Sequence, residues 1–442
     1  MHTQEPSVIS PVIVPRAEHN ISRSRISESA LKVLYRLKSA GYESYMVGGG
    51  VRDLLLGREP KDFDVATDAR PEEVRALFRN CRIIGRRFRL AHVQFGREII
   101  EVATFRANRA VAEEAAAGSA SDNGRILRDN TYGTLEEDAL RRDFSVNALY
   151  YDIRDFSVRD YVGGLADLHA GVLRLIGDPA TRYREDPVRM LRAARFAAKL
   201  GFRVHPDTAA PIAELAPLLA DIPLARLFEE ILKLFLYGFG AQAFEHLRRY
   251  GLFARLFPRT DSLLDTEEQG FPHTFISRAL VSTDTRVTED KPVTPAFLFA
   301  ALMWEPVRQR AAKLESTGTH PVEALRQAAD ELVFEQVAHV ALPRRFATPM
   351  IEIYQMQPRF LQREGKRPLR FLAHPRFRAA YDFLMLRAEA GEVDAELTGW
   401  WTRLQAAGTD AERELLAPAT VAAVGRRRRS RRRRRHKVSA PA

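Results

Sequence analysis

The sequence predicts an α+β protein with a small mixed-sheet head, a long all-α body and a disordered Arg-rich tail. Three observations support this prediction. Strand-like and helix-like segments alternate up to about residue 180, the pattern is almost wholly helical from Tyr183 onward, and the chain after Gly425 is rich in Arg. The chain has 442 residues, of which 45% are hydrophobic, so several folded domains are expected and a wholly disordered protein is excluded.

The head is expected to span residues 27–180, after a flexible leader of residues 1–26 that mixes Pro, Ser and Arg without periodicity. Apolar residues at helical spacing predict its first helix over residues 27–40. The further predicted elements are a strand over 42–47, a short helix over 51–56, a strand over 63–65, a helix over 71–78, a hairpin of 90–95 with 98–104, and a helix over 136–151. Residues 107–124 are rich in Ala, Gly and Ser and are expected to form a surface loop.

The body is expected to divide into a helical neck over residues 181–265, which would read the base and bind RNA, and a helical C-terminal region over 266–424. Residues 224–237 show clear helical periodicity, and residues 265–292 are polar enough to predict a connector. The tail would then comprise residues 425–442.

Positive charge is concentrated in this tail. The whole chain carries +11, whereas residues 425–442 contain nine Arg and one Lys without an acid. Such a segment repels itself and buries nothing apolar, so we expect it to be disordered until it binds a polyanion such as RNA, although a merely solubilising tail is an alternative. The candidate RNA-binding residues are Arg426, Arg427, Arg428, Arg429, Arg431, Arg432, Arg433, Arg434 and Arg435.

Nothing in the sequence predicts a membrane or secreted protein. The N-terminus lacks the apolar core of a signal peptide, and the longest apolar run, residues 296–304, is too short to span a bilayer. Cys81 is the sole cysteine, which excludes an internal disulfide and fits a reducing compartment. We therefore expect a soluble, cytoplasmic protein.

Two carboxylates two residues apart give the strongest local signal. Residues i and i+2 of a strand face the same side, so Asp62 and Asp64 in KDFD would present both carboxylates together, an arrangement that suits Mg²⁺. The alternative is an ordinary acidic turn.

A glycine run precedes this pair by about a dozen residues. Gly48, Gly49 and Gly50 lie between a predicted strand and a predicted helix, where backbone N–H groups can approach a phosphate and Arg52 can offer a second contact. A plain tight turn is the alternative, and the spacing is not that of a Walker loop or a dinucleotide fingerprint.

A third acid is needed if two metal ions share the site. Glu101 could face the pair from the predicted hairpin, and Asp143 lies four residues before Asn147 on one face of the helix predicted there. Either could instead be an ordinary surface charge.

Four motifs occur in order: GGGVRD, KDFD, RRDFSVNALYYD and REDPVRMLRAARFAAKLGF. Together they resemble the class II nucleotidyltransferases of the DNA polymerase β superfamily, which comprise bacterial poly(A) polymerases and CCA-adding enzymes, over roughly residues 45–260. The resemblance implies that the triphosphate is held by Gly48, Gly49 and Arg52, catalytic metal by Asp62 and Asp64, the nucleotide by Arg142 with Asp143 as an acid, and the base by Asp186 and Arg189 with Arg192 one turn further on.

The spacing agrees with part of this assignment. Arg189, Arg192 and Arg195 recur every three residues and form a cationic stripe on a predicted amphipathic helix. Asp186 directly precedes Pro187, so it could instead be a helix cap.

Within the family, residues 83–93 (IIGRRFRLAHV) and the Arg-rich tail resemble the poly(A) polymerases. Arg86 and Arg87 in this stretch are further candidates for RNA contacts, or else an unremarkable solvated strand end. No His-Asp dipeptide occurs, which disfavours the phosphohydrolase domain carried by some CCA-adding relatives.

The implied activity is a template-independent polynucleotide adenylyltransferase that adds AMP from ATP to RNA 3′ ends with two Mg²⁺ ions, as in mRNA polyadenylation. A tRNA CCA-adding enzyme is the alternative, and a non-catalytic RNA-binding protein is a more distant one. RNA-decay or RNA-chaperone proteins are possible partners, and no membrane is implied.

Overall fold

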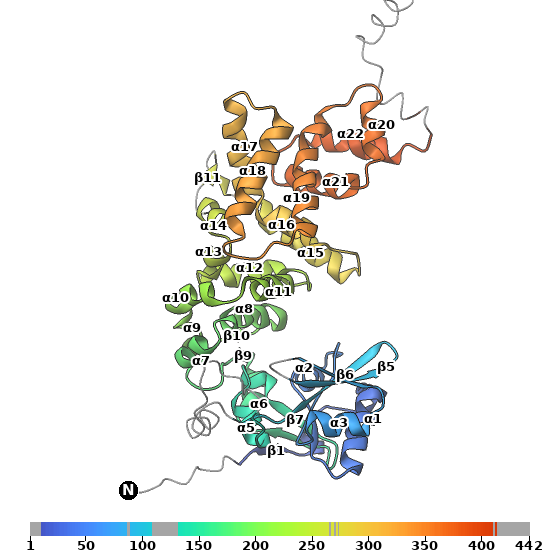
Figure 1. Cartoon of the computed structure of the whole chain (residues 1–442), viewed down its shortest axis with the longest axis vertical. Coiled ribbons are helices and arrows are strands. Elements are labelled where there is room, and N and C mark those ends of the chain that lie inside the picture. Colours follow the sequence, from blue (N-terminus) through green and yellow to red (C-terminus); the bar gives the residue numbers. More distant parts are fainter. Residues whose placement is uncertain are drawn as a thin grey trace, which may run out of the picture. The chain divides into compact units, whose positions relative to one another are not determined.

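The computed structural model describes residues 10–85, 89–107, 131–264, 267–268, 271–272, 274–409 and 412 (Figure 1). Its contacts divide the chain into two compact units, Met1–Leu215 and Ala216–Ala442. The boundary that we expected at residue 180 therefore falls inside the first unit. The expected surface loop, apart from residue 107, and the Arg-rich tail lie outside the described residues.

The first unit is built on a mixed sheet, as predicted. Its strand order is β1-β8-β7-β2-β3-β6-β5-β4, and within this sheet β3 and β6 pair in parallel while the other neighbours are antiparallel. The strands are β1 Val12–Val14, β2 Ser44–Val47, β3 Asp64–Thr67, β4 Cys81–Ile84, β5 Leu90–Phe95, β6 Glu98–Thr104, β7 Leu149–Asp152 and β8 Val158–Asp160.

The expected flexible leader contributes β1, which pairs antiparallel with β8 at the sheet edge. Val12 and Ile13 are 65% and 53% exposed, so this strand is held by backbone hydrogen bonds and shows no buried periodicity in the sequence. The assignment of residues 1–26 as a flexible leader is therefore wrong for residues 12–14.

Helices cover both faces of this sheet. Helices α1 (Glu28–Ser39) and α3 (Pro71–Leu77) contact β6, and Leu135 and Ala139 of α5 (Leu135–Leu140) pack with Val47 and Ala66. The remaining elements of this unit are α2 Gly49–Leu55, α6 Gly164–Ala170, α7 Pro179–Glu185, α8 Val188–Leu200, α9 Pro206–Ala209, α10 Ile212–Leu215 and the short parallel pair β9 Val172–Leu173 and β10 Arg203–Val204.

One predicted helix is wrong. Residues 136–151 do not form a single helix, because α5 ends at Leu140, a 3₁₀ turn covers Ser145–Asn147 and β7 begins at Leu149. All four residues of β7 are buried, so this strand lacks the alternation of polar and apolar residues that would have revealed it.

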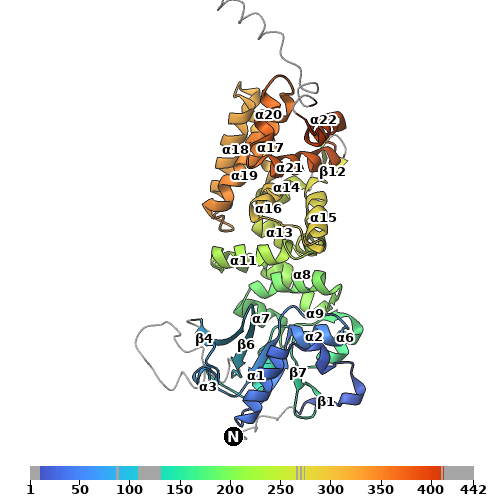
Figure 2. The ribbon, with the colours of Figure 1, turned by 90° about the vertical axis from the view of Figure 1, so that its right-hand side faces the viewer.

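The second unit is almost wholly helical, as predicted, and its path can be followed in Figure 2. The polar connector expected over residues 265–292 contains α15 (Phe275–Thr288) and the short strand pair of β11 (Glu267–Glu268) and β12 (Phe271–Pro272), so that expectation is wrong in part. Trp401 and Phe360 centre one of its cores. Its elements are α11 Leu224–Phe235, α12 Gly240–Arg249, α13 Leu252–Leu256, α14 Pro258–Leu264, β11 Glu267–Glu268, β12 Phe271–Pro272, α15 Phe275–Thr288, α16 Pro295–Leu302, α17 Trp304–Ser316, α18 Pro321–Gln336, α19 Arg344–Met356, α20 Arg367–Leu372, α21 Phe377–Glu389 and α22 Ala395–Ala406.

Among the described residues, no helix combines the length and the apolar character needed to cross a bilayer.

Candidate active site

Three neighbouring strands bring the predicted acidic residues and the glycine run together. Val47, at the end of β2, pairs with Asp64, and Asp64 pairs in turn with Glu101 on β6. Paired residues of adjacent strands present their side chains on the same face of a sheet. Asp64 and Glu101 therefore lie side by side, next to the point where the chain leaves β2 for the glycines.

The glycine turn makes a close approach to this acidic cluster. Gly48 has φ +73°, and a Cβ atom added to it would lie 3.8 Å from Asp64 Oδ2 and 3.7 Å from Arg142 Nη1. A Cβ on Gly50 would lie 3.4 Å from the Asp62 carbonyl oxygen. Because these glycines have no side chains, little more than backbone atoms would separate a bound ligand from the carboxylates.

The two aspartates of KDFD differ in their environment. Asp64 is the first residue of β3, whereas Asp62 precedes the strand, so strand alternation does not by itself fix the direction of Asp62. Burial, followed by the charge of Glu101, raises the pKa of Asp64 to about 6; Arg142 opposes this shift and Asp62 adds to it. The site thus gathers three carboxylates around one guanidinium, and it favours an added cation.

Glu101 is more accessible than Asp64. Its side chain is 48% exposed, and its Oε1 atom lies 3.3 Å from Nε2 of His92 on β5. Glu101 is therefore free to reach a ligand on the face where Asp64 lies.

Asp143 is held in a different way. Its carboxylate accepts hydrogen bonds from Arg192 Nε at 2.8 Å, from the Phe144 backbone N–H at 2.8 Å and from Asn147 Nδ2 at 3.3 Å. Burial alone would raise the pKa of Asp143, but Arg192 and these hydrogen bonds lower it to about 2. The contact with Asn147 arises across the 3₁₀ turn and not along the predicted helix.

Arg52 is buried beneath the glycine turn. It is 1% exposed; Nε donates to Asp53 Oδ1 at 2.8 Å and Nη1 donates to Asn147 Oδ1 at 2.5 Å. Its guanidinium carbon also lies 5.6 Å from the centre of the Phe196 ring. These contacts join α2 to the 3₁₀ turn that contains Asn147. Nothing in the sequence marks Asp53 and Asn147 as its partners, although both lie inside the recognised motifs.

Arg142 combines a structural contact with one free direction. Its Nε and Nη2 atoms donate to Asp138 Oδ2 at 3.1 and 2.9 Å, and Nε also donates to the Tyr150 hydroxyl at 2.8 Å. Although Arg142 is desolvated, Tyr150 and Asp138 raise its pKa above the usual range. Because these bonds occupy Nε and Nη2, the Nη1 atom near Gly48 can face a bound phosphate.

Helix α8 carries the expected cationic stripe. Arg189 Nη1 donates to Glu185 Oε2 at 2.9 Å and to the Arg182 carbonyl at 2.7 Å, while Arg192 binds Asp143. Asp186 Oδ1 accepts a hydrogen bond from Val188 N at 3.3 Å, just before the helix. Two of the three residues expected to recognise the base, Arg189 and Arg192, thus make ion pairs.

Two groups of predicted RNA-binding residues lie outside the described residues, namely Arg86 and Arg87 and the nine Arg of the tail. Their neighbour Arg89 is described and pairs with Glu72.

Within the described ranges, no three His, Cys, Asp or Glu side chains are arranged to hold a metal ion by themselves. Mg²⁺ is commonly bound by one or two carboxylates together with waters and substrate phosphates, so the acidic cluster fits an ion that arrives with a nucleotide.

A glycine turn beside a carboxylate cluster on a small mixed sheet is the arrangement of a nucleotidyltransferase, and comparisons with known proteins specify the family. Residues 44–174 match the poly A polymerase head domain, residues 201–264 the probable RNA and SrmB-binding site of polymerase A, and residues 317–436 the polymerase A arginine-rich C-terminus. The chain is 52% identical to poly(A) polymerase I of Salmonella typhi over 91% of this chain and 88% of that protein. It is 48% identical to the Haemophilus influenzae poly(A) polymerase I over 91% and 90% of the two chains. The chain belongs to the bacterial poly(A) polymerase I family.

More distant similarity extends to CCA-adding enzymes. The Geobacillus stearothermophilus enzyme is 38% identical over 52% of this chain and 54% of its own length. Among solved structures, a tRNA-processing enzyme (apo form I) matches with a TM-score of 0.61 at 22% identity, covering 90% of this chain and 99% of that one. A Thermotoga maritima CCA-adding enzyme complexed with tRNA matches with a TM-score of 0.57 at 16% identity, covering 94% and 92% of the two chains. These structural matches show the shared fold.

Proposed function

We propose that this poly(A) polymerase adds AMP from ATP to RNA 3′ ends, without a template, at the site where the glycine turn faces Asp64 and Glu101. The observation that carries the proposal is the register of β2, β3 and β6, which places these three features side by side. Pyrophosphate is the second product.

Asp62 and Asp64 are the residues that would hold two Mg²⁺ ions, with the triphosphate supplying further oxygens. When bound, the ions neutralise the triphosphate and lower the pKa of the attacking 3′ hydroxyl. The crowding of Asp64 by two other carboxylates supports this assignment, because like charges at close range are unfavourable until a cation joins them.

The turn at Gly48 and Gly49 would orient the triphosphate through backbone N–H groups, with Arg142 Nη1 close to the same turn. Arg52 acts from below by fixing the turn to Asp53 and Asn147. Asp186 and Arg189 would recognise the adenine, and the bond from Arg192 to Asp143 would orient α8 towards the nucleotide.

Geometry favours Glu101 over Asp143 as the third carboxylate. Glu101 is exposed beside Asp64, whereas the carboxylate of Asp143 already accepts three groups of the protein. In this scheme Asp143 is a positioning residue.

We expect Asp62→Asn to reduce the incorporation of labelled AMP into an oligo(A) primer by at least about 100-fold, because one of the paired carboxylates is lost while the volume is kept. Glu101→Gln should give a similar loss of kcat with an unchanged unfolding midpoint. Substantial activity in Asp62→Asn would contradict the metal assignment.

The choice between ATP and CTP tests the alternative of a CCA-adding enzyme. ATP should support extension of oligo(A), and CMP from CTP should not be added to tRNA that lacks its 3′ end. Efficient incorporation of CMP would favour the alternative.

We also propose that residues 201–264 and the tail contact RNA. RNA-decay or RNA-chaperone proteins, and a partner of the SrmB kind, would dock on residues 201–264. The protein would work in the cytoplasm. The match of residues 201–264 to an RNA and SrmB-binding site supports the first two parts.

A further inference from the structure

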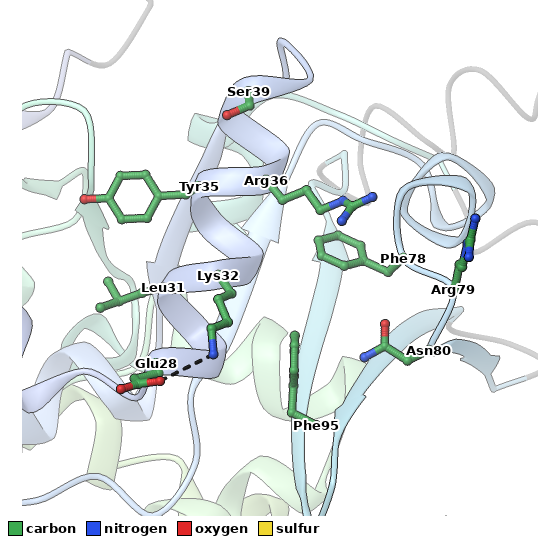
Figure 3. Close-up of a pocket in the computed structure, with 10 residues that line it drawn as sticks. All are labelled: Glu28, Leu31, Lys32, Tyr35, Arg36, Ser39, Phe78, Arg79, Asn80 and Phe95. Atoms are coloured by element: carbon green, nitrogen blue, oxygen red, sulfur yellow. Dashed lines mark hydrogen bonds and ion pairs between the residues drawn. The ribbon is translucent and has the colours of Figure 1, made fainter.

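An open groove lies on the reverse face of the head sheet, between α1 and the segment that joins α3 to β4 (Figure 3). Its volume is about 1020 Å³. In the pairing of β5 with β6, Phe95 is opposite Glu98 and His92 is opposite Glu101, so alternation places Phe95 and Glu101 on opposite faces of the sheet. The groove is therefore separate from the site that faces the glycine turn.

Two aromatic side chains form part of its wall. Phe78 comes from the end of α3 and Phe95 from the end of β5, whereas the Tyr35 ring of α1 points away from both (Figure 3) and its hydroxyl accepts a hydrogen bond from Arg23 Nη1 at 2.9 Å. Phe78 is buried at the base, and Phe95 is half-buried, which leaves part of its ring accessible.

Positive charge surrounds these rings. Lys32, Arg36 and Arg79 are exposed at the rim, and Figure 3 shows Arg36 reaching from α1 towards Phe78. The Arg36 guanidinium carbon lies 5.4 Å from the centre of the Phe78 ring. Glu28 is the one acid in the lining, and it already pairs with Lys32 at 3.3 Å. The lining therefore keeps an excess of positive charge.

We infer that this groove binds single-stranded RNA upstream of the 3′ end that is being extended. Cations along a groove follow a phosphate backbone, and the accessible Phe95 ring among them can stack with a base irrespective of sequence, which suits a homopolymer. The inference rests on RNA being the substrate, as proposed above.

Removal of two rim charges tests the electrostatic part. The double variant Arg36→Gln/Arg79→Gln should bind a 20-nucleotide oligo(A) about tenfold more weakly at low salt, with a slope of log K against log salt that is smaller by about 1.4. Extension of a three-nucleotide primer should be unchanged, because such a primer is too short to occupy both sites.

The matched control is Lys38→Gln/Arg203→Gln, which removes two exposed charges of the same unit outside the groove. It should leave the affinity and the salt slope close to those of the unmodified protein. Equal losses in the two double variants would overturn the inference, because they would show a general effect of charge.

Phe95→Leu tests stacking at constant charge. It should weaken binding of the long oligo(A) about five- to tenfold with little change of the salt slope and an unchanged unfolding midpoint. If the variant has a lowered unfolding midpoint, photoreactive oligo(A) is crosslinked to the unmodified protein instead. The labelled peptides should then include residues 78–80 or Phe95.

Unchanged RNA binding in both the charge and the stacking variants, or crosslinks that avoid these residues, would overturn the inference. Failure of the unmodified protein to extend any RNA primer would instead contradict the proposed function.

Discussion

Two arginines near the glycine turn differ in the partners that they bind. Arg52 resembles a phosphate ligand in sequence, yet it is buried and bound to Asp53 and Asn147. Arg142 keeps one nitrogen directed towards Gly48. Both lie in recognised motifs, so sequence alone could not separate their roles, which depend on partners brought together from different parts of the chain.

Replacement of Arg52 by Lys tests its supporting role. A Lys cannot make both the Asp53 and the Asn147 contacts. We therefore expect the free energy of unfolding, measured in urea, to be about 3 kcal/mol lower in the variant. Arg184→Lys, at an exposed position, should leave stability unchanged. A normal unfolding curve together with a raised KM for ATP would instead identify Arg52 as a phosphate ligand.

The Asp143–Arg192 pair predicts a change of stability in acid. The pKa of Asp143 is about 2 in the folded protein against its ordinary 3.8, so its stabilising contribution is present above pH 4 and is lost as the pH falls towards 2. Compared with the unmodified protein, Asp143→Asn should be less stable by about 2 kcal/mol at pH 5, and the difference should vanish near pH 2. Urea unfolding at both pH values measures this, and a difference that persists at pH 2 would contradict it.

At the scale of elements, the site is positioned by one continuous segment, which consists of β2, the glycine turn and α2. Gly48 has φ +73° and ψ −135°, a conformation that a residue with a side chain adopts only with strain, and this is why a glycine stands there. The sequence predicted these elements because their periodicity and glycines are local signals. The sequence did not predict β7, because this strand is buried on both faces and so lacks the alternation of polar and apolar residues.

Gly48→Ala should therefore cost about 1–3 kcal/mol of stability and lower the affinity for ATP, since relief of the strain would move the turn. Gly49→Ala is the matched control, because Gly49 has no positive φ and its added Cβ would make an ordinary contact, 3.6 Å from Arg52 Nη2. Thermal unfolding and ATP binding are measured for both variants. Equal effects would show that the added methyl group, and not backbone strain, causes the loss.

At the scale of the whole molecule, the residues that we propose to be catalytic lie within the first unit, whereas the similarity to RNA-binding and arginine-rich regions begins at residue 201 and extends through the second. We therefore expect that RNA binding by the tail can be altered without changing the proposed catalytic site.

Deletion of residues 425–442 tests this separation. Loss of ten cations should weaken RNA binding and reduce the salt slope by up to about 7, while the KM for ATP stays unchanged. RNA binding of the full chain and the truncated chain over a salt series measures the effect. A slope that does not change would leave the tail as a solubilising segment.

The sequence by itself determined the fold class, the glycine turn, the Asp62 and Asp64 pair and the charged tail, because each depends on residues that are close along the chain. Only the tertiary structure decided that Glu101 lies beside Asp64 and that Asp143 binds Arg192, since strand register and helix packing join distant segments. The same holds for the groove on the reverse face, whose aromatic and basic residues come from separate elements and share no motif.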